Sequence, residues 1–252
     1  MRQIVEMIQL IDLTKQYREI KAVDRINLHV DKGARFGFLG PNGAGKTTTI
    51  KMMTGVLQPT GGRIIINGYD MAVSPAALKA CIGFIPDRPF MYEKLTGLEF
   101  LDFVAGLYGL DRSARLKGRM ADLLTRFDLQ GWEDQLIESY SHGMKQRLVM
   151  CAALVHEPEV LIVDEPMVGL DPKGARLVKD IFKEQAGNGV TLFMSTHSLE
   201  TAEEVCEKIA IIRNGRLVAH GTPEELRNQA GTDGKLEDVF LRLTQEKGIA
   251  KP

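Results

Sequence analysis

Residues 40–47 place the strongest constraint on how this chain can fold. They read GPNGAGKT and fit the pattern Gly-x-x-x-x-Gly-Lys-Ser/Thr at every fixed position. The apolar stretch FGFL precedes the loop and TTTIKMMTG follows it, so the loop lies between a predicted strand and a predicted helix. That context favours a phosphate-binding loop over a chance glycine turn, and it predicts an α/β fold.

The residue types in this loop suit the binding of a nucleoside triphosphate. Its glycines let successive backbone N–H groups point into one concavity, and the helix that follows adds its positive end. Lys46 can bring a mobile charge to the β- and γ-phosphates, and the Thr47 hydroxyl can ligate Mg²⁺. The predicted nucleotide-binding residues of the loop are Gly40, Pro41, Asn42, Gly43, Ala44, Gly45, Lys46, Thr47 and Thr48.

A second part of the predicted site follows the apolar run VLIV, which ends in Asp164, Glu165 and Pro166. We expect Asp164 to hold Mg²⁺ through a water, opposite Thr47. Glu165 is then free to orient and deprotonate an attacking water. The same three residues could form an ordinary turn at the end of a strand, but the phosphate loop favours the catalytic interpretation.

Strands and helices alternate along most of the chain, which indicates a mainly parallel sheet. Apolar residues alternate with polar ones over residues 26–30, which predicts a half-exposed strand. Asn214 and Gly215 predict a hairpin turn. Between them an inserted helical lobe is predicted, because apolar residues recur at helical spacing in two sets: Leu98, Leu101, Val104 and Leu107; and Leu116, Met120, Leu123, Leu124 and Phe127.

Composition limits the classes of function. The net charge is −1, so no overall basic field favours nucleic acid or an anionic membrane surface. No run of 18 uncharged apolar residues occurs, and the polar, acidic start is unlike a signal peptide. The cysteines are three, with no CxxC pair, which favours buried thiols in a reducing compartment; they are Cys81, Cys151 and Cys206.

An unusual helix start lies in the stretch SYSHGMKQRL, residues 139–148. Ser141 can cap a helix that begins near Met144, and Gly143 keeps the backbone accessible. Such a helix end attracts an anion. Since the chain's own nucleotide would lie in the loop at residues 40–48, we expect this end to hold a phosphate bound to another copy, in a two-fold dimer. An ordinary capped helix is the alternative.

Together these motifs resemble the nucleotide-binding subunit of ATP-binding cassette (ABC) transporters, and the spelling is most similar to the ABC-2 type exporter branch. YSHGMKQR is similar to the family's signature motif LSGGQ, with the serine and the second glycine kept as Ser141 and Gly143. The positions that depart from it are Tyr140, His142 and Met144. The resemblance extends from about residue 8 to about residue 226.

The resemblance implies further roles. Asp171 lies in the family's D-loop, His197 corresponds to a histidine that contacts the γ-phosphate, and Tyr17 to an aromatic residue that stacks on adenine. A structural histidine and an exposed loop tyrosine are the alternatives. The implied catalytic residues are Glu165, His197 and Lys46. Where the family has a glutamine that reaches Mg²⁺ and the attacking water, this chain has Asp87, which is shorter and charged; the implied metal residues are Thr47, Asp164 and Asp87.

The resemblance also implies an organisation. The whole chain, 1–252, would be a single nucleotide-binding domain. It would have an α/β P-loop NTPase core with an N-terminal antiparallel β lobe at 1–87 and 148–226, the inserted helical lobe at about 88–147 and a short helical tail at 227–252. Residues 89–92, PFMY, form an apolar loop on which a membrane partner's helix could dock; packing of this loop on its own lobe is the alternative.

The function implied is that of an ATPase subunit. A homodimer or heterodimer would close around two ATP with Mg²⁺ and drive export through separate integral membrane permease subunits. The subunit itself would be cytoplasmic, peripheral on the inner face of the cell membrane, with no membrane span and no nucleic-acid partner. The alternatives are a soluble cassette ATPase acting on ribosomes or DNA, and a small-molecule kinase with the same phosphate loop.

Overall fold

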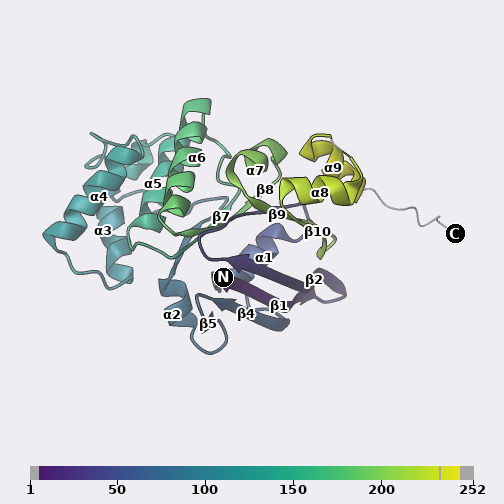
Figure 1. Ribbon diagram of the computed structural model, residues 1–252. Coiled ribbons are helices and arrows are strands. Elements are labelled where there is room, and N and C mark those ends of the chain that lie inside the picture. Colours follow the sequence, from purple (N-terminus) through teal and green to yellow (C-terminus); the bar gives the residue numbers. More distant parts are fainter. Residues whose placement is uncertain (1–5, 233, 245–252) are drawn as a thin grey trace.

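The computed structural model describes residues 6–232 and 234–244, and it has a layered α/β architecture. A four-stranded antiparallel sheet faces one side of a six-stranded sheet, with helix α1 between them, and helices α3 to α7 cover the other side (Figure 1). This is the predicted arrangement of an antiparallel lobe, a mainly parallel core and a helical lobe.

The antiparallel sheet has the strand order β2-β1-β4-β5. Residues Ile26, Leu28 and Val30 are buried and their neighbours face outward, so the alternation in the sequence predicted the inward face of β2. The strands are β1 (Glu6–Tyr17), β2 (Ile20–Asp31), β4 (Gly61–Ile66) and β5 (Tyr69–Asp70).

The six-stranded sheet has the order β10-β9-β3-β8-β7-β6, and all neighbours are parallel except the β9–β10 hairpin. The hairpin turns at Asn214 and Gly215, whose φ angles of 48° and 76° are the positive values expected for a type I′ turn. The strands are β3 (Arg35–Leu39), β6 (Ile82–Ile85), β7 (Val160–Asp164), β8 (Thr191–Thr196), β9 (Lys208–Arg213) and β10 (Arg216–Gly221).

The helical lobe contains α3 (Gly97–Leu107), α4 (Ala114–Arg126), the short 3₁₀ helix η1 (Ile137–Ser139) and the start of α5 (His142–Leu154). The predicted spacing in α4 is confirmed, because its apolar residues are buried. In α3 the helix itself is confirmed, but its predicted buried face is not, because Leu98 and Leu107 are 37% and 71% exposed. A step of three residues drifts by about 60° around a helix, so four such residues span about half its circumference and cannot share one face.

The remaining helices are α1 (Lys46–Met53), α2 (Pro75–Ala80), α6 (Pro172–Gly187), α7 (Leu199–Val205), α8 (Pro223–Ala230) and α9 (Leu236–Thr244). Two helices cross boundaries that were expected from the sequence. Helix α5 runs across the predicted boundary at 147/148, and α8 begins inside the predicted core because Thr222 caps it there in a capping box. The tail is helical to residue 244, and residues 245–252 lie outside the described part.

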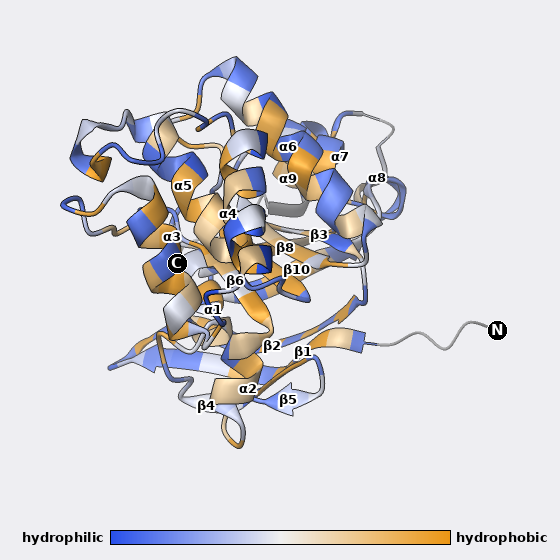
Figure 2. Cartoon of the chain, turned by 90° about the vertical axis from the view of Figure 1, so that its left-hand side faces the viewer, coloured by the Kyte–Doolittle hydropathy of each residue, from blue (hydrophilic) through white to orange (hydrophobic). Residues whose placement is uncertain are grey.

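Two hydrophobic cores flank the six-stranded sheet. One lies between the two sheets and includes α1, and the other joins the sheet to the helices (Figure 2). The three cysteines are free and buried, as predicted. Burial raises the pKa of the Cys81 thiol to about 11 and that of Cys206 to about 12. Within residues 6–232 and 234–244, none of the helices combines the length and apolar character needed to traverse a lipid bilayer.

Candidate nucleotide-binding and hydrolytic site

The predicted phosphate loop forms one wall of a cleft of about 300 Å³. Strands β3, β6, β7 and β8 all end at this edge of the sheet, because neighbouring parallel strands place their carboxyl ends together. The lining residues are Ala22, Pro41, Asn42, Gly43, Gly45, Lys46, Thr47, Thr48, Asp87, Glu165, Val168 and His197. The structure therefore brings most of the predicted site residues together.

Close backbone contacts explain two glycines of the loop. A Cβ atom at Gly40 would lie 2.4 Å from the carbonyl oxygen of Ile212 in β9, and one at Gly45 would lie 2.6 Å from that of Ala22 in β2. Gly43 has open space around it, but its φ of 77° is one that other residues rarely adopt. The loop can therefore keep its curved path only with glycine at these positions.

Lys46 is held at the floor of this loop. Its side chain is 6% exposed, its Nζ donates to the carbonyl oxygen of Gly40 at 2.7 Å, and it lies 3.7 Å from Glu165 Oε1. The ammonium group thus joins the phosphate loop to the carboxylate at the end of β7. A nucleotide phosphate entering the cleft would offer it a stronger, doubly charged acceptor.

Asp164 is 2% exposed and lies among hydroxyl groups. Its carboxylate accepts hydrogen bonds from Ser195 and Thr47. Burial raises the pKa of Asp164, the two hydrogen bonds lower it in part, and the charges of Asp87 and Glu165 raise it further. A cation beside Thr47 and Asp164 would relieve this penalty, so the donor set fits Mg²⁺.

No group of three or more His, Cys, Asp or Glu side chains in the described residues could by itself hold a metal ion. A Mg²⁺ ion at Thr47 and Asp164 would therefore need further oxygen ligands. Phosphate oxygens and waters supply these in nucleotide sites, where the ion usually has only one or two protein ligands.

Glu165 and His197 lie in direct contact. Glu165 Oε2 is 2.9 Å from His197 Nδ1 and accepts from the His197 backbone N–H at 3.3 Å. Glu165 also has a φ of 51°, a left-handed conformation that costs about 1 kcal/mol outside glycine. Its backbone N–H donates to the carbonyl oxygen of Ser195 at 3.1 Å, which anchors the strained residue to β8. The carboxylate is thus fixed toward the cleft.

The helix with the unusual start, α5, begins two residues earlier than predicted, at His142. Ser141 is its N-cap, and its hydroxyl accepts from the Met144 backbone N–H at 3.3 Å. The structure therefore has the predicted cap at Ser141, although the sequence analysis expected the helix to begin near Met144. Ser141 and Gly143 do not line the cleft of their own chain.

The sequence did not predict the contact that His142 makes. A Cβ atom at Gly169 would lie 2.2 Å from the His142 ring, so the imidazole lies against the bare backbone of this glycine. Gly169 follows Glu165 by four residues and has a φ of 80°. The tip of α5 and the loop after β7 are therefore in contact within one chain.

Two further predicted residues lie outside the cleft lining. Asp171 is the N-cap of α6 and accepts from the Gly174 backbone N–H at 2.9 Å. Tyr17 lies at the end of β1, is 48% exposed, and has the Lys15 Nζ 5.3 Å from its ring centroid. Their roles toward a nucleotide stay predictions.

The sequence analysis did not predict two residues that line the cleft, Ala22 and Val168. Ala22 approaches the loop through its backbone carbonyl, and no residue pattern identifies such a contact. Val168 follows the Asp-Glu pair in a loop without periodicity, so the sequence offered no signal for it either.

A glycine-rich loop between a strand and a helix, two carboxylates at the end of a neighbouring parallel strand, and an inserted helical lobe define a nucleotide-hydrolysing cassette of the P-loop class. Residues 23–168 match the family described as ABC transporter, and the chain belongs to this family.

Relatives extend the match over nearly the whole chain. The daunorubicin resistance ATP-binding protein DrrA3 of Streptomyces coeruleorubidus is 38% identical over 236 residues, which are 94% of this chain and 74% of that protein. The ABC-type transporter ATP-binding protein EcsA of Bacillus subtilis strain 168 is 35% identical, over 96% of this chain and 98% of that protein. A solved ATP-binding subunit of an ABC transporter has a TM-score of 0.89 at 35% identity, covering 95% of this chain and 100% of that one.

The family assigns the chemistry of the cleft: the chain is an ATP-binding cassette, and it hydrolyses ATP. This excludes the small-molecule kinase considered from the phosphate loop alone. Neither relative named above is described as acting on ribosomes or DNA.

Proposed function

We propose that two copies of this cassette, or this cassette and a related one, close around two ATP molecules with Mg²⁺. The observation that supports the dimer most strongly is the position of Ser141. Its helix tip is exposed and suited to an anion, yet it does not line the cleft in which its own chain would hold ATP. A second copy is the partner that would give this tip a phosphate.

Within each cleft the residues divide the work. Thr47 and Asp164 would hold Mg²⁺, whose charge offsets that of the transferred phosphoryl group. Lys46 binds the β- and γ-phosphates, and Glu165 orients and deprotonates the attacking water. His197 stays beside the γ-phosphate and keeps Glu165 in place through their 2.9 Å contact. Asp87 lines the same cleft and would reach the metal or the water.

Export through separate membrane subunits is the process that this hydrolysis would drive. DrrA3 is named for daunorubicin resistance, and EcsA is named as the ATP-binding protein of an ABC-type transporter. The chain would then be cytoplasmic and attached to the inner face of the membrane through integral permease subunits, without nucleic acid as a partner.

An exposed aromatic patch supports a membrane partner. It consists of Phe90, Tyr92 and Phe103, which are 83%, 53% and 41% exposed. Their rings contact one another edge to face, at centroid distances of 5.8 and 5.4 Å. Met91 of the same loop is buried, so the loop packs on its own lobe through Met91 and presents Phe90 outward. We propose that an apolar helix of a permease subunit docks on this patch, in which Phe90 follows Asp87 of the cleft by three residues.

The dimer is tested with Glu165→Gln. The amide cannot take a proton from water, so hydrolysis should slow by about 10²–10⁴ while ATP still binds. Size-exclusion chromatography with MgATP should then show a dimer, and removal of ATP should return the monomer.

Ser141→Arg in the same background is the matched control. It should keep ATP binding, because Ser141 is outside the cleft, but should not dimerise. A Glu165→Gln chain that stays monomeric with saturating MgATP, or a Ser141→Arg chain that dimerises normally, would contradict the proposal.

A further inference from the structure

The phosphate loop, strand β2 and the β9–β10 turn are in direct backbone contact. A Cβ atom at Gly45 would lie 2.6 Å from the carbonyl oxygen of Ala22, and one at Gly215 would lie 2.8 Å from the same oxygen. The Gly215 N–H donates to the carbonyl oxygen of Ala44 at 2.9 Å. The β9–β10 turn and strand β2 therefore both contact the loop that binds phosphate.

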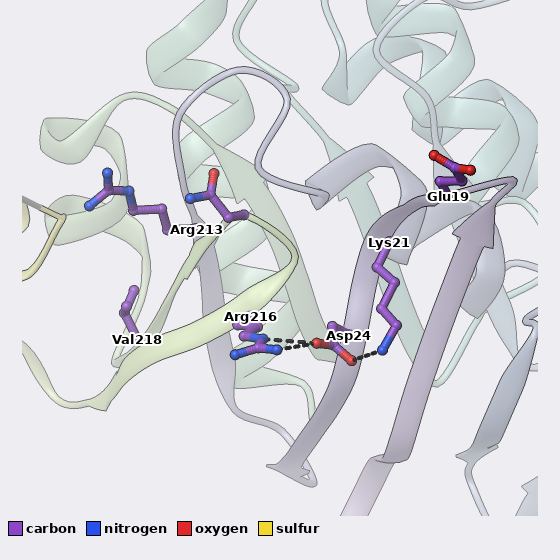
Figure 3. Close-up of a pocket in the computed structure, with 7 residues that line it drawn as sticks. Glu19, Lys21, Asp24, Arg213, Arg216 and Val218 are labelled. Atoms are coloured by element: carbon purple, nitrogen blue, oxygen red, sulfur yellow. Dashed lines mark hydrogen bonds and ion pairs between the residues drawn. The ribbon is translucent and has the colours of Figure 1, made fainter. Parts of the chain in front are cut away.

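Asp24 joins the turn to β2. Its backbone N–H donates to the carbonyl oxygen of Gly215 at 2.8 Å. Its carboxylate Oδ2 accepts from Arg216 Nε at 2.9 Å and from Nη2 at 2.6 Å, at a shallow pocket of about 610 Å³ (Figure 3). Asp24 is 7% exposed, and the guanidinium of Arg216 beside it lowers its pKa. A charge-assisted bond of this kind is stronger than a neutral one.

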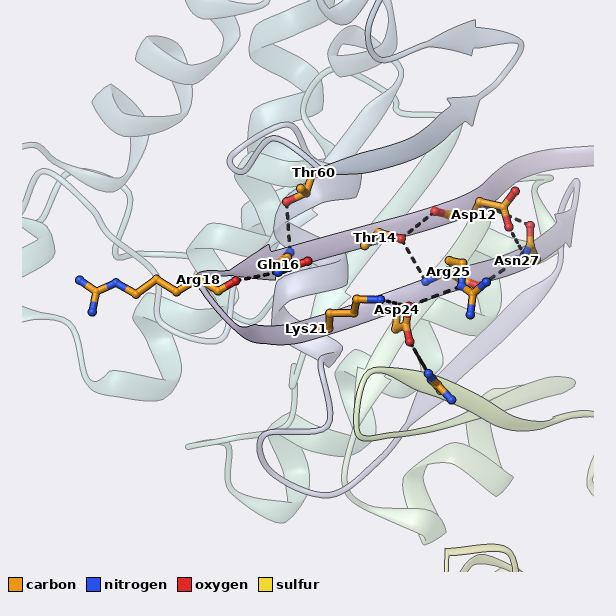
Figure 4. Close-up of polar contacts among 10 residues, drawn as sticks. Asp12, Thr14, Gln16, Arg18, Lys21, Asp24, Arg25, Asn27 and Thr60 are labelled. Atoms are coloured by element: carbon orange, nitrogen blue, oxygen red, sulfur yellow. Dashed lines mark hydrogen bonds and ion pairs between the residues drawn. The ribbon is translucent and has the colours of Figure 1, made fainter.

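Two other cations reach the same carboxylate. Lys21 Nζ lies 3.3 Å and Arg25 Nε 3.6 Å from Asp24 Oδ1 (Figure 4). Both residues lie on β2, the strand that carries Asp24 itself. Arg216 lies on β10, directly after the turn. Among these three, only Arg216 ties β2 to the segment that contacts Ala44.

We propose that the Asp24–Arg216 pair positions the phosphate loop for nucleotide binding. The pair holds the β9–β10 turn on β2, and the turn holds Ala44 through Gly215, one residue from Gly45 and two from Lys46. Neither Asp24 nor Arg216 lines the nucleotide cleft, so both act through the loop. The inference rests on ATP binding at this loop and needs neither the dimer nor export.

Arg216→Ala and Arg25→Ala form a matched comparison, because each removes one arginine from the same carboxylate. The Kd for MgATP, measured by isothermal titration calorimetry, should rise about tenfold in Arg216→Ala, which corresponds to about 1.4 kcal/mol. It should stay within twofold of the unaltered value in Arg25→Ala. The kcat at saturating MgATP should be unchanged in both, because the groups that contact ATP are intact.

Asp24→Asn provides an independent variant, since it keeps the side-chain shape. Its Kd should rise like that of Arg216→Ala, and the double variant should be no weaker than either single one, as for two groups of one interaction. Arg216→Lys should recover part of the affinity, because it keeps the charge but not the fork.

Thermal unfolding without nucleotide separates positioning from stability. A purely structural pair would lower the midpoint of Arg216→Ala and leave the Kd of its folded fraction unchanged, and that result would overturn the inference. Equal rises in Kd for Arg216→Ala and Arg25→Ala would overturn it as well, because they would indicate a general charge effect. Failure of the unaltered chain to bind MgATP would count against the ATP site and not against the pair.

Discussion

Glu165 shows how single residues set the chemistry of the cleft. It occupies a left-handed conformation that costs about 1 kcal/mol, and contacts with Ser195 and His197 hold it there. Such strain persists only where neighbouring groups over-determine the position. The carboxylate is therefore held in place without a nucleotide, which suits the general-base role proposed for it.

The phosphate contact of Lys46 can be tested directly. Lys46→Ala removes a nearly buried cation from the loop, so tight ATP binding should be lost, with Kd rising by about 10²-fold or more, as expected for a charge-assisted contact of about 3 kcal/mol. Equilibrium binding of a fluorescent ATP analogue measures this. Unchanged affinity with an intact fold by circular dichroism would contradict the assigned site.

A substitution at Asp87 tests how the departure from the family pattern affects the ATPase rate. Asp87→Gln restores the residue that the resemblance implies and removes a charge that raises the pKa of Asp164. The ATPase rate should then respond differently to the membrane partner, while the basal rate of the isolated chain changes by less than about threefold, under 1 kcal/mol in barrier. Equal changes in both rates would make Asp87 a metal-site residue only.

Residues in local patterns could be predicted, and residues in distant contacts could not. Lys46, Thr47, Asp164 and Glu165 follow strands in recognisable order, so their meeting at one sheet edge was predictable. The Asp24–Arg216 pair joins residues 192 positions apart. Neither residue belongs to a motif, so only the folded chain brings them together.

At the scale of elements, periodicity predicted the buried face of β2 and of α4 but not that of α3. Helix α3 forms as expected, but of the four residues in its predicted apolar set only Leu101 is buried, together with Phe100 and Ala105. Helix α5 begins at His142 because Ser141 caps it, and it continues into the core without interruption. A boundary drawn between lobe and core therefore falls inside one continuous helix.

The contact between α5 and the loop after β7 predicts an effect of Gly169→Ala. The new Cβ would overlap the His142 ring, so the tip of α5 or the loop that follows Glu165 must move. We expect a loss of stability of about 2–4 kcal/mol, from the positive φ and the overlap, together with a slower ATPase rate.

Gly189→Ala is the control, because Gly189 has a φ of 92° and open space around it. It should lower stability by about 1–2 kcal/mol and leave the ATPase rate of the folded protein unchanged. His142→Ala should partly rescue Gly169→Ala. Denaturant unfolding and steady-state ATPase assays measure both properties. If His142→Ala did not rescue Gly169→Ala, or if Gly169→Ala and Gly189→Ala lost the same ATPase activity, the His142 contact would have no role in hydrolysis.

At the scale of the whole molecule, the aromatic patch predicts a separable attachment surface. Phe90→Arg should leave the ATPase rate of the isolated chain within about twofold, because Phe90 is exposed and outside the cleft. It should abolish co-purification with the permease subunit from detergent-solubilised membranes, since a charge would be buried against an apolar helix.

Val73→Arg is the control for this surface. Val73 is 79% exposed and lies in the segment between β5 and α2, outside the three aromatic residues of the patch. Its permease recovery should match that of the unaltered chain. If Phe90→Arg recovered as much permease as the unaltered chain does, the patch would not be the docking site.

The arrangement of two copies around shared nucleotides is tested most directly by a structure of Glu165→Gln with MgATP. The account predicts paired molecules in which Ser141 Oγ of one chain lies about 2.5–3.2 Å from the γ-phosphate held by Lys46 of the other. Paired or single molecules in which Ser141 contacts no nucleotide would contradict it.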